Sequence, residues 1–311
     1  MAFDAESTTD QVLEGIRLDG KHALVTGATG GLGIETARAL ASVGASVTIG
    51  GRSPEKIASA LETLRSEVPG ATFDAIEVDL ASLSSIASAT KAYVDGGQTI
   101  DLLINNAGVM MCPEGKTADG FETQFGTNHL GHFAFTAGLF PALSPGARVV
   151  TLSSGAHLRG TCDLDDLNWE SRDYDPNLAY AHSKTANIWF ASELQRRYGD
   201  RLLSLSVHPG VIQTDLSRHL PEAIVEGMRD GFEKAGVSIK TVPQGAATSV
   251  WAATAPELGD HGGAYLLDCH VAPPISEEVP RQGYEQWAYD EASEKALWEK
   301  SLALTGVSFP A

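Results

Sequence analysis

The feature that most constrains the fold is a regular alternation of short apolar runs with longer amphipathic segments. Residues 22–26 form the first apolar run, and an amphipathic segment that ends at Gly44 follows a glycine-rich turn. Strands and helices that alternate at this spacing pair in parallel through right-handed crossovers. The sequence therefore predicts a doubly wound α/β fold with a mostly parallel sheet of about seven strands.

The remaining segments continue this pattern along the chain. Further strands are expected at residues 45–50, 72–78, 101–105, 148–153, 203–208 and 264–267. Further helices are expected at residues 54–68, 83–94, 120–143, 178–198 and 243–255. No repeat or linker divides the chain, so we expect residues 1–311 to form one domain, with residues 1–20 as a short helical arm.

A glycine-rich turn joins the first strand to the first helix. Gly27, Gly31 and Gly33 have the spacing GxxxGxG, and Gly30 adds a further glycine. Glycine lets main-chain N–H groups approach a pyrophosphate, and the helix N-terminus adds partial positive charge. Such a turn can also serve packing alone, but its place between a strand and a helix is the context that dinucleotide binding requires.

The ends of the next strands indicate which dinucleotide binds. Gly50 and Gly51 precede Arg52, where NAD-binding sites usually carry an acidic side chain for the ribose. Arg52 is instead suited to a 2′-phosphate, so NADP is favoured and NAD stays open. Asp79, followed by Leu80, is expected near the adenine, and residues 105–108 (Asn-Asn-Ala-Gly) combine strand-tying amides with small residues that let main chain approach a flat ligand.

Tyr180 and Lys184 lie four residues apart in a predicted helix. Side chains at this spacing project from one face, and a nearby ammonium favours ionisation of a phenol. A tyrosine in this setting can exchange a proton near neutral pH. Taken alone, the pair fits an ordinary helix surface better, so its functional meaning depends on the other motifs.

Together these motifs resemble the short-chain dehydrogenase/reductase family, which has a Rossmann-type fold. The residues that carry the resemblance are, in chain order, Thr26, Gly27, Gly31, Gly33, residues 105–108, Asn128, Ser154, Tyr180, Lys184, Pro209 and Gly210. A closer similarity is to the retinol-dehydrogenase-like branch, which includes the WW-domain oxidoreductases. It depends on NNAGVMM at residues 105–111, TNHLGHF at 127–133, YAHSKTAN at 180–187, VHPG at 207–210 and Asp-Cys-His at 268–270.

The resemblance implies hydride transfer between a nicotinamide and a carbonyl or alcohol carbon. Tyr180 is then the proton donor and acceptor, Lys184 lowers its pKa and holds the nicotinamide ribose, and Ser154 donates to the substrate oxygen. Asn128 either holds a water that links Lys184 to solvent or merely kinks its helix. The implied cofactor-binding residues are Gly27, Thr29, Gly30, Gly31, Leu32, Gly33, Arg52, Asp79, Leu80, Asn106, Ala107, Gly108, Tyr180, Lys184, Pro209, Gly210, Ile212 and Thr214.

Two departures from the family pattern are visible. NADP-preferring members often carry a basic residue just before the middle glycine, where this chain has Gly30, so preference for the phosphate depends on Arg52. The separation of Ser154 and Tyr180 is wider than in most of the family, a feature shared with the retinol-dehydrogenase branch.

Two segments are candidates for the substrate side. One is the acidic insertion at residues 155–179. The other spans residues 215–242, where apolar side chains recur every four residues, and by resemblance it is expected to be a lid over an apolar or aromatic substrate. Residues 273–311 form a C-terminal tail expected to cover the pocket mouth or to contact a second subunit.

Charge and composition exclude several classes of protein. The net charge of -18 disfavours nucleic-acid binding. The three cysteines have no metal-site spacing and no disulfide framework, so we expect no metal and a reducing, cytoplasmic compartment. No signal peptide or membrane span is expected. Whether the protein forms a homodimer or a homotetramer is left open.

Two other functions remain open on the sequence. One is reduction of a C=C bond, as in an enone or a protochlorophyllide-like substrate, although Ser154 favours carbonyl chemistry because a developing oxyanion needs a donor. The other is a dinucleotide-sensing protein without chemistry, which typically loses the tyrosine or the lysine that this chain keeps.

Overall fold

The computed structural model describes residues 3–212, 216, 222–234, 237–277 and 282–310. Its centre is an eight-stranded sheet with the order β10-β9-β6-β5-β4-β1-β2-β3. The strands are β1 (His22–Thr26), β2 (Ser46–Gly51), β3 (Phe73–Glu77), β4 (Ile100–Asn105), β5 (Leu143–Leu152), β6 (Leu202–His208), β9 (Tyr265–Leu267) and β10 (His270–Val271). The predicted doubly wound α/β fold is therefore confirmed.

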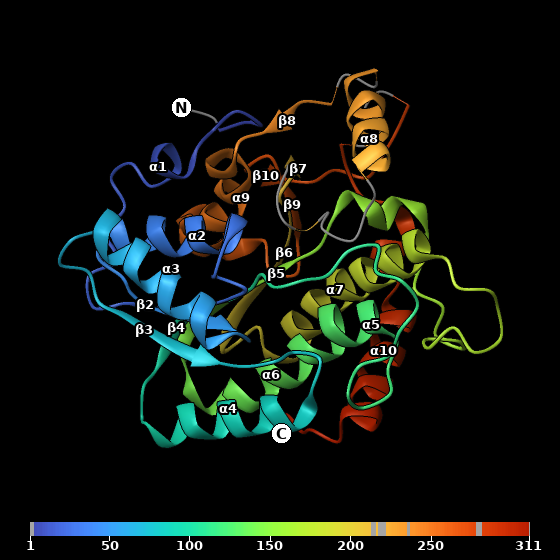
Figure 1. Cartoon of the computed structure of the whole chain (residues 1–311), viewed down its shortest axis with the longest axis horizontal. Helices are drawn as coiled ribbons and strands as arrows, with labels where there is room; N and C mark the ends of the chain where they lie inside the picture. The colour runs from blue at the N-terminus through green and yellow to red at the C-terminus, as the bar shows by residue number, and fades with distance from the viewer. Residues whose placement is uncertain (1–2, 213–215, 217–221, 235–236, 278–281, 311) are drawn as a thin grey trace.

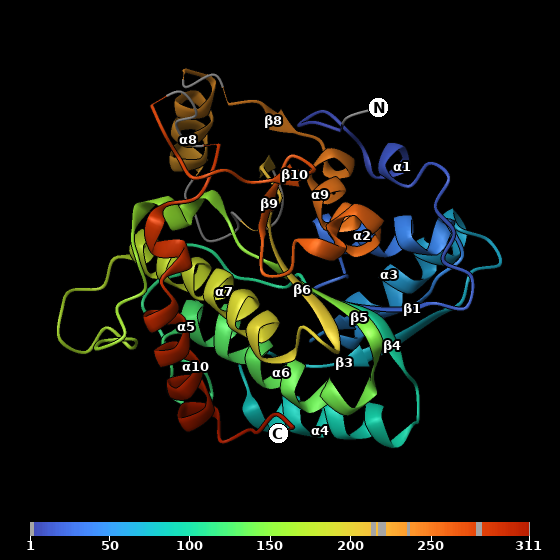
Figure 2. The same cartoon turned by 180° about the vertical axis from the view of Figure 1, so that it is seen from behind.

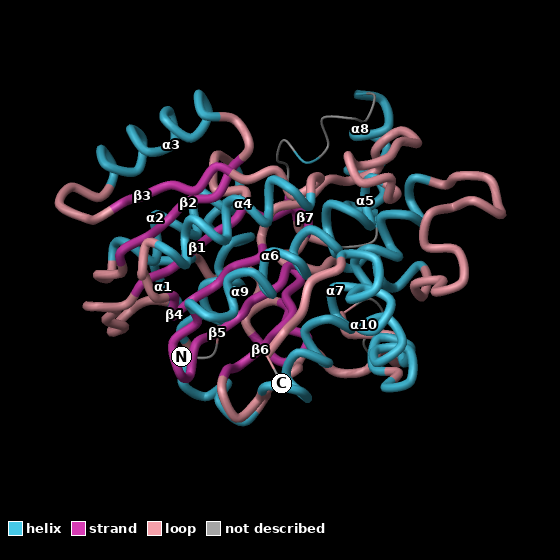
Figure 3. Tube along the Cα trace, turned by 90° about the horizontal axis from the view of Figure 1, so that it is seen from below, coloured by secondary structure: helices cyan, strands magenta, loops and turns pink. Residues whose placement is uncertain are grey.

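Helices cover both faces of this sheet (Figures 1 and 2). One face carries α2 (Gly31–Ser42), α3 (Pro54–Glu67) and α9 (Val242–Thr254), whose apolar side chains join one core cluster. The other face carries α4 (Leu83–Asp95), α6 (Gly131–Leu139) and α7 (Pro176–Tyr198), and α10 (Glu291–Thr305) packs against α7. Figure 3 shows the strands as a twisted row that begins beside α3.

The central strands are apolar because both of their faces are covered. All five residues of β1 are buried, and β1 pairs in parallel with β2 and β4. Leu24 of β1 faces the second core cluster, whereas Val25 faces the first, as the two-residue period of a strand requires. Each such buried side chain contributes roughly 1.5–3 kcal/mol of hydrophobic stabilisation.

The sheet has one strand more than expected. β10 pairs antiparallel with β9 and forms the edge of the sheet, whereas the other strands pair in parallel. The two strands are joined by Asp268 and Cys269, which both have positive φ, at 49° and 57°. This two-residue turn was not predicted, because left-handed φ is uncommon for residues other than glycine.

Two predicted helices differ in the structure. The helix expected at residues 120–143 is divided into α5 (Thr123–Phe125), a π-helical turn at Gly126–Leu130, α6 and a 3₁₀ turn at Phe140–Ala142. Within residues 3–20, the described part of the N-terminal arm, only α1 (Thr9–Val12) is helical, with a capping box between Thr8 and Gln11. Val12 and Leu13 are buried and Ile16 is partly buried, so the predicted apolar contacts of the arm are present.

The chain after β6 adds a small two-stranded sheet. β7 (Val211–Ile212) pairs in parallel with β8 (Ile239–Lys240), and α8 (Glu222–Lys234) lies between them in the sequence. Both views show α8 on the same side of the molecule as β8 and far from α4 (Figures 1 and 2). Further 3₁₀ helices span Gly155–Arg159, Pro256–Asp260 and Gln286–Tyr289. In the part of the chain that is described, no helix has the length and apolar character needed to cross a bilayer.

Candidate active site

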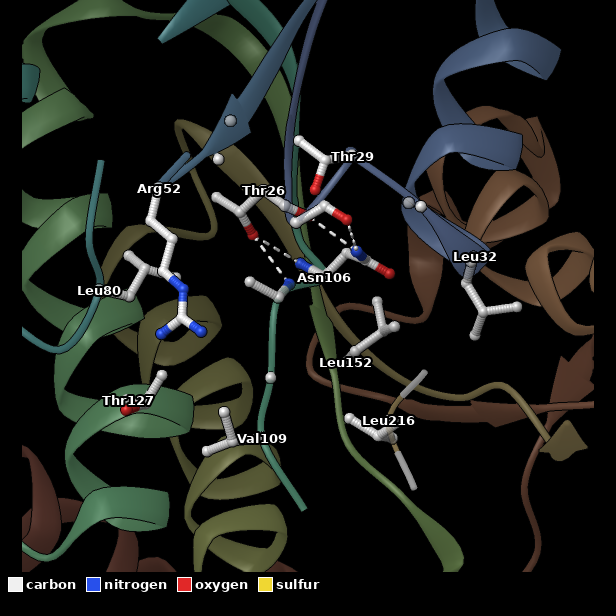
Figure 4. Close-up of a pocket in the computed structure, with 18 of the residues that line it drawn as sticks. Thr26, Thr29, Leu32, Arg52, Leu80, Asn106, Val109, Thr127, Leu152 and Leu216 are labelled. Carbon is white, nitrogen blue, oxygen red and sulfur yellow. Dashed lines mark hydrogen bonds between the residues drawn. The ribbon is translucent and has the colours of Figure 1, made fainter. Parts of the chain in front are cut away.

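A cleft of about 490 Å³ lies at the carboxyl edge of the parallel sheet. Open α/β sheets bind ligands at this edge, where the strand order reverses beside the first strand. Figure 4 shows Arg52 and Leu80 on one side of the cleft and Leu32, Leu152 and Leu216 on the other. The lining residues are Thr26, Gly27, Thr29, Gly30, Gly31, Leu32, Gly33, Gly50, Gly51, Arg52, Ser53, Lys56, Val78, Asp79, Leu80, Asn106, Ala107, Gly108, Val109, Thr127, Leu152, Ser153, Tyr180, Lys184, Pro209 and Leu216.

The glycine turn needs its glycines for two different reasons. Gly27 and Gly31 have φ values of +65° and +54°, which side chains rarely adopt. A Cβ at Gly33 would lie 2.4 Å from the Gly27 carbonyl oxygen, so the helix can approach the strand this closely only with glycine there. Gly30 is extended, and a Cβ there would have no atom within 4 Å, so this glycine, unlike Gly33, has room for a side chain.

The N-terminus of α2 is open toward the cleft. Its N-cap residue is Gly30, which offers no side-chain hydrogen bond to the first turn. The N–H groups of that turn therefore keep their donor capacity, and the helix dipole adds partial positive charge. This is the chemistry of an anion site, and the glycine cradle leaves the space that a pyrophosphate requires. The residues present thus fit a dinucleotide.

Polar and charged groups gather at the end of β2. Arg52 is exposed and lines the cleft together with Ser53 and Lys56 at the start of α3, and its predicted contact with a 2′-phosphate stays a prediction. Lys56 was not predicted as a site residue. The sequence could have indicated Lys56, because it lies four residues after Arg52, at the start of the helix that follows β2. Asp79 also lines this end of the cleft.

The end of β4 is tied to the end of β1 by a small network (Figure 4). The main-chain N–H groups of Asn106 and Ala107 donate to Thr26 Oγ1, at 2.9 and 3.0 Å. Asn106 Nδ2 donates to the Thr26 carbonyl oxygen at 2.7 Å, and Asn105 Nδ2 donates to Thr136 Oγ1 at 3.0 Å. The prediction that these amides tie neighbouring strands together is confirmed for Asn106, which joins β4 to β1. Asn105 bonds more closely to α6 and reaches Thr151 of β5 only at 3.5 Å.

Tyr180 and Lys184 both line the cleft, in the part of α7 that is buried on all sides. Lys184 Nζ is 5.5 Å from the centroid of the Tyr180 ring and donates to the Leu152 carbonyl oxygen at 3.0 Å. Ser154 caps the 3₁₀ turn that follows β5, and its hydroxyl lies near enough to the phenol to influence the pKa of Tyr180. The Ser153 hydroxyl donates instead to the Lys184 carbonyl oxygen at 2.7 Å, which leaves Ser154 as the serine beside Tyr180.

Burial dominates the acid–base properties of this pair. Burial raises the pKa of Tyr180 to about 12, and the nearby Ser154 hydroxyl acts in the opposite direction. It also lowers the pKa of Lys184 to about 7, because an ammonium is poorly solvated there. We predicted that Lys184 lowers the pKa of Tyr180, but in the protein without a cofactor the pKa of Tyr180 is raised.

Asn128 lies in the π-helical turn and holds the loop after β4. Its Oδ1 accepts from the Val109 main-chain N–H at 2.8 Å, and its Nδ2 donates to the Val109 carbonyl oxygen and to Ser183 Oγ, both at 2.9 Å. A Cβ on Gly108 would lie 3.3 Å from Asn128 Oδ1 and 3.7 Å from Lys184 Nζ, so both groups border this glycine. The side chain of Asn128 therefore has a structural role at a kink, and its predicted part in a water relay stays a prediction.

The segment after β6 reaches the cleft through Pro209. Gly210 has φ +93° and packs against the methylene chain of Lys240, which forms an ion pair with Asp268. Ile212 lies in β7, and a Cβ on Gly245 would lie 2.5 Å from it. Thr214 lies outside the described residues, so its predicted contact with the nicotinamide is not described.

The two predicted substrate segments differ in how they contact the rest of the site. In the insertion, the Tyr174 hydroxyl donates to Glu122 Oε1 and accepts from Gln124 Nε2, both at 2.9 Å. Gln124 Oε1 in turn accepts from the Met111 main-chain N–H at 2.7 Å. These bonds join the insertion to the loop after β4. On α8, Ile224 is 51% exposed and Phe232 is half-buried, so the predicted apolar stripe faces solvent at Ile224.

The fold and this cleft define a Rossmann-type dinucleotide-binding oxidoreductase. The family model for short chain dehydrogenases matches residues 21–224. The chain is 39% identical to the short-chain dehydrogenase/reductase prx1 of Penicillium roqueforti, over 98% of this chain and 92% of that one. It is 38% identical to retinol dehydrogenase 13 of Homo sapiens, over 94% and 87%. The protein belongs to the short-chain dehydrogenase/reductase family.

Solved structures agree with this assignment. An uncharacterised protein from Mycobacterium paratuberculosis superimposes with a TM-score of 0.73 at 37% identity, covering 95% of this chain and 97% of that one. A short chain dehydrogenase from Burkholderia cenocepacia in complex with NADP gives a TM-score of 0.66 at 26% identity, covering 81% and 97%. The predicted resemblance to the retinol-dehydrogenase-like branch is confirmed by the similarity of this chain to human retinol dehydrogenases.

Proposed function

We propose that this protein is an NADP-dependent dehydrogenase/reductase that interconverts a carbonyl group and an alcohol on an apolar or aromatic small molecule. The observation that carries the proposal is the meeting of Tyr180, Ser154 and Lys184 at the carboxyl edge of the sheet, beside an open glycine cradle. The nicotinamide would supply or accept the hydride. The chain itself supplies the proton and the donors around the reacting oxygen.

Each of the three residues has one task in this proposal. The Tyr180 phenol gives a proton to the substrate oxygen in reduction and takes it back in oxidation. Ser154 donates to the same oxygen, where negative charge grows during the reaction. Lys184 adds positive charge behind the phenol and opposes the effect of burial on its pKa. Positive charge on an oxidised nicotinamide acts in the same direction as the ammonium.

The preference for NADP is supported by the charges at the adenosine end of the cleft. Arg52 and Lys56 both line it, and Ser53 caps the N-terminus of α3 between them. Two cations and a helix N-terminus favour a 2′-phosphate. The solved relative from Burkholderia cenocepacia was crystallised with NADP.

An apolar substrate is supported by the side chains near the reacting groups. Val109, Leu152 and Leu216 line the same cleft as Tyr180 and Lys184. A relative whose name is retinol dehydrogenase 13 points to the same class of alcohol. The lid assigned to residues 215–242 remains part of this proposal. We expect alanine at Phe232 to raise KM for large ketones more than for small ones.

The test is NADPH oxidation against a panel of aldehydes, ketones and enones. The proposal predicts turnover of apolar aldehydes or ketones and slower turnover with NADH. Tyr180→Phe should lower kcat by at least about a hundredfold, the contribution of a well-placed general acid, while the dissociation constant of NADPH changes little. Activity confined to the C=C bond of enones, or normal turnover by Tyr180→Phe, would contradict the proposal.

A further inference from the structure

One buried histidine connects the helix that carries Asn128 to the strand that leads into the glycine turn. His132 lies in α6 and is buried. Its Nδ1 is 2.9 Å from the Asn128 main-chain oxygen, in the π-helical turn. Its Nε2 is 2.9 Å from Thr26 Oγ1, at the end of β1. A single ring thus joins two elements that contribute residues to the cleft.

The hydrogen-bond partners determine which ring nitrogen carries the proton. A main-chain carbonyl only accepts, so Nδ1 of His132 must carry a hydrogen toward Asn128. Thr26 Oγ1 accepts from the N–H groups of Asn106 and Ala107, and these two bonds use both of its lone pairs. The Thr26 hydroxyl hydrogen is then available for Nε2, which lies closer than the alternative acceptor, the Ile104 carbonyl oxygen at 3.4 Å. His132 is therefore neutral with its proton on Nδ1.

A charged ring would not fit this network. Protonated Nε2 would point a second donor at Thr26 Oγ1, which has no lone pair left for it. Burial lowers the pKa of His132 to about 4, and the Lys184 ammonium on α7 acts in the same direction, whereas the Asn128 carbonyl opposes it. The neighbouring His129 has its own pKa lowered by burial and by His132.

The network reaches the dinucleotide cleft at two points. Through Thr26, His132 orients the main chain of Asn106 and Ala107, which both line the cleft. Through Asn128, it supports the turn whose side chain holds the Val109 main chain from both sides. A histidine that only filled the core would contribute to stability but would not orient the main chain at Asn106 and Ala107 or at Val109.

We propose that His132 is a positioning residue for the dinucleotide cleft, holding the end of β1, the end of β4 and the Asn128 turn in register through its neutral Nδ1–H tautomer. This inference rests on the proposed function only in that the cleft takes a nicotinamide dinucleotide. It adds a residue that does not itself line the cleft and acts on it through Thr26 and Asn128. The bonds that carry it join residues 26, 106, 107, 128 and 132.

The experiment compares two substitutions at His132 with a matched control. His132→Phe keeps a ring of similar shape but removes both hydrogen bonds, and His132→Gln restores one donor and one acceptor. His129→Phe is the control, because His129 is buried in the preceding turn but is bonded through Nε2 to Ser301 of α10, at 2.9 Å and away from the cleft. For each protein we measure the dissociation constant of NADPH by fluorescence titration and the midpoint of thermal unfolding.

We expect the two positions to differ: substitution of His132 should weaken NADPH binding, whereas substitution of His129 should lower only the stability. His132→Phe should weaken NADPH binding about tenfold, the effect of one or two lost buried hydrogen bonds, and His132→Gln should recover part of it. His129→Phe should lower the unfolding temperature and leave NADPH affinity within about twofold. If His132→Phe lowers stability alone and binds NADPH as the wild type does, His132 is a core residue and the inference is wrong.

A second measurement keeps the inference testable if His132→Phe fails to fold. Nitrogen-15 NMR of the cofactor-free wild-type protein reports which ring nitrogen of His132 is protonated. A proton on Nδ1 alone supports the network, and a proton on Nε2 at neutral pH overturns it. Neither the NMR measurement nor the NADPH titration requires turnover, so the two proposals can fail separately. If no aldehyde or ketone is reduced but His132→Phe still weakens NADPH binding, the proposed reaction is contradicted and the inference about His132 stands.

Discussion

Alanine at Gly33 tests the geometry of the glycine turn most directly. Its Cβ would lie 2.4 Å from the Gly27 carbonyl oxygen and 2.6 Å from Asn106 Nδ2. Neither atom is free to yield, since one belongs to the main chain and the other donates to the Thr26 carbonyl oxygen at 2.7 Å. We expect Gly33→Ala to lower the free energy of unfolding by about 1–3 kcal/mol, the usual cost of overpacking.

This cost can be expressed as two measured quantities. For 311 residues, an unfolding entropy of roughly 2.1 cal/mol/K per residue converts 1 kcal/mol into about 1.5 °C of unfolding temperature. Gly33→Ala should therefore unfold about 2–5 °C below the wild type. The shifted turn also displaces the α2 N–H groups, so we expect the dissociation constant of NADPH to rise by about tenfold or more.

Gly30→Ala is the matched control in the same turn. Gly30 is extended, and a Cβ there would have no atom within 4 Å. We expect a loss of about 0.5–1 kcal/mol at most, because alanine is a weaker N-cap than glycine, and little change in NADPH affinity. Equal losses in both variants, or wild-type binding and stability in Gly33→Ala, would refute the argument from close approach.

Three further outcomes follow from the structure. Arg52→Ala and Lys56→Ala should each weaken NADPH binding about two- to tenfold and leave NADH binding unchanged, because they remove exposed cations facing a 2′-phosphate; titration with both cofactors checks this. Lys240→Met should lower the free energy of unfolding by about 1–3 kcal/mol, because it leaves the partly exposed Asp268 carboxylate without its partner. Lys240→Met with Asp268→Asn should recover part of the loss in denaturant unfolding. The free energy of unfolding should fall as pH drops from about 6.5 toward 4, because histidine rings take up protons in the unfolded chain but stay neutral in the folded protein. The loss should reach up to about 1.4 kcal/mol per pH unit for each histidine with a lowered pKa. Denaturant titrations that show no dependence on pH in this range would contradict the prediction. These histidines, with pKa values of about 4, are His132, His157, His182 and His208.

The sequence by itself determined the order of strands and helices and the main parts of the cleft. Strand and helix periods are local properties, so β1 and α3 begin and end within one residue of the predicted bounds. The glycine spacing and the four-residue separation of Tyr180 and Lys184 are local as well. Both patterns predict geometry directly, because the shape of a turn and the face of a helix depend only on residues that are neighbours in sequence.

Only the tertiary structure decided which distant groups meet and how they titrate. The ring of His132 contacts Thr26 across 106 residues of sequence, and no local pattern encodes that bond. The β9–β10 turn uses two residues in left-handed conformation that the surrounding packing must hold. The high pKa of Tyr180 has the same origin. Burial depends on the whole fold, and in the protein alone it outweighs the opposing effect of Ser154, whereas the four-residue spacing predicts a pKa lowered by Lys184.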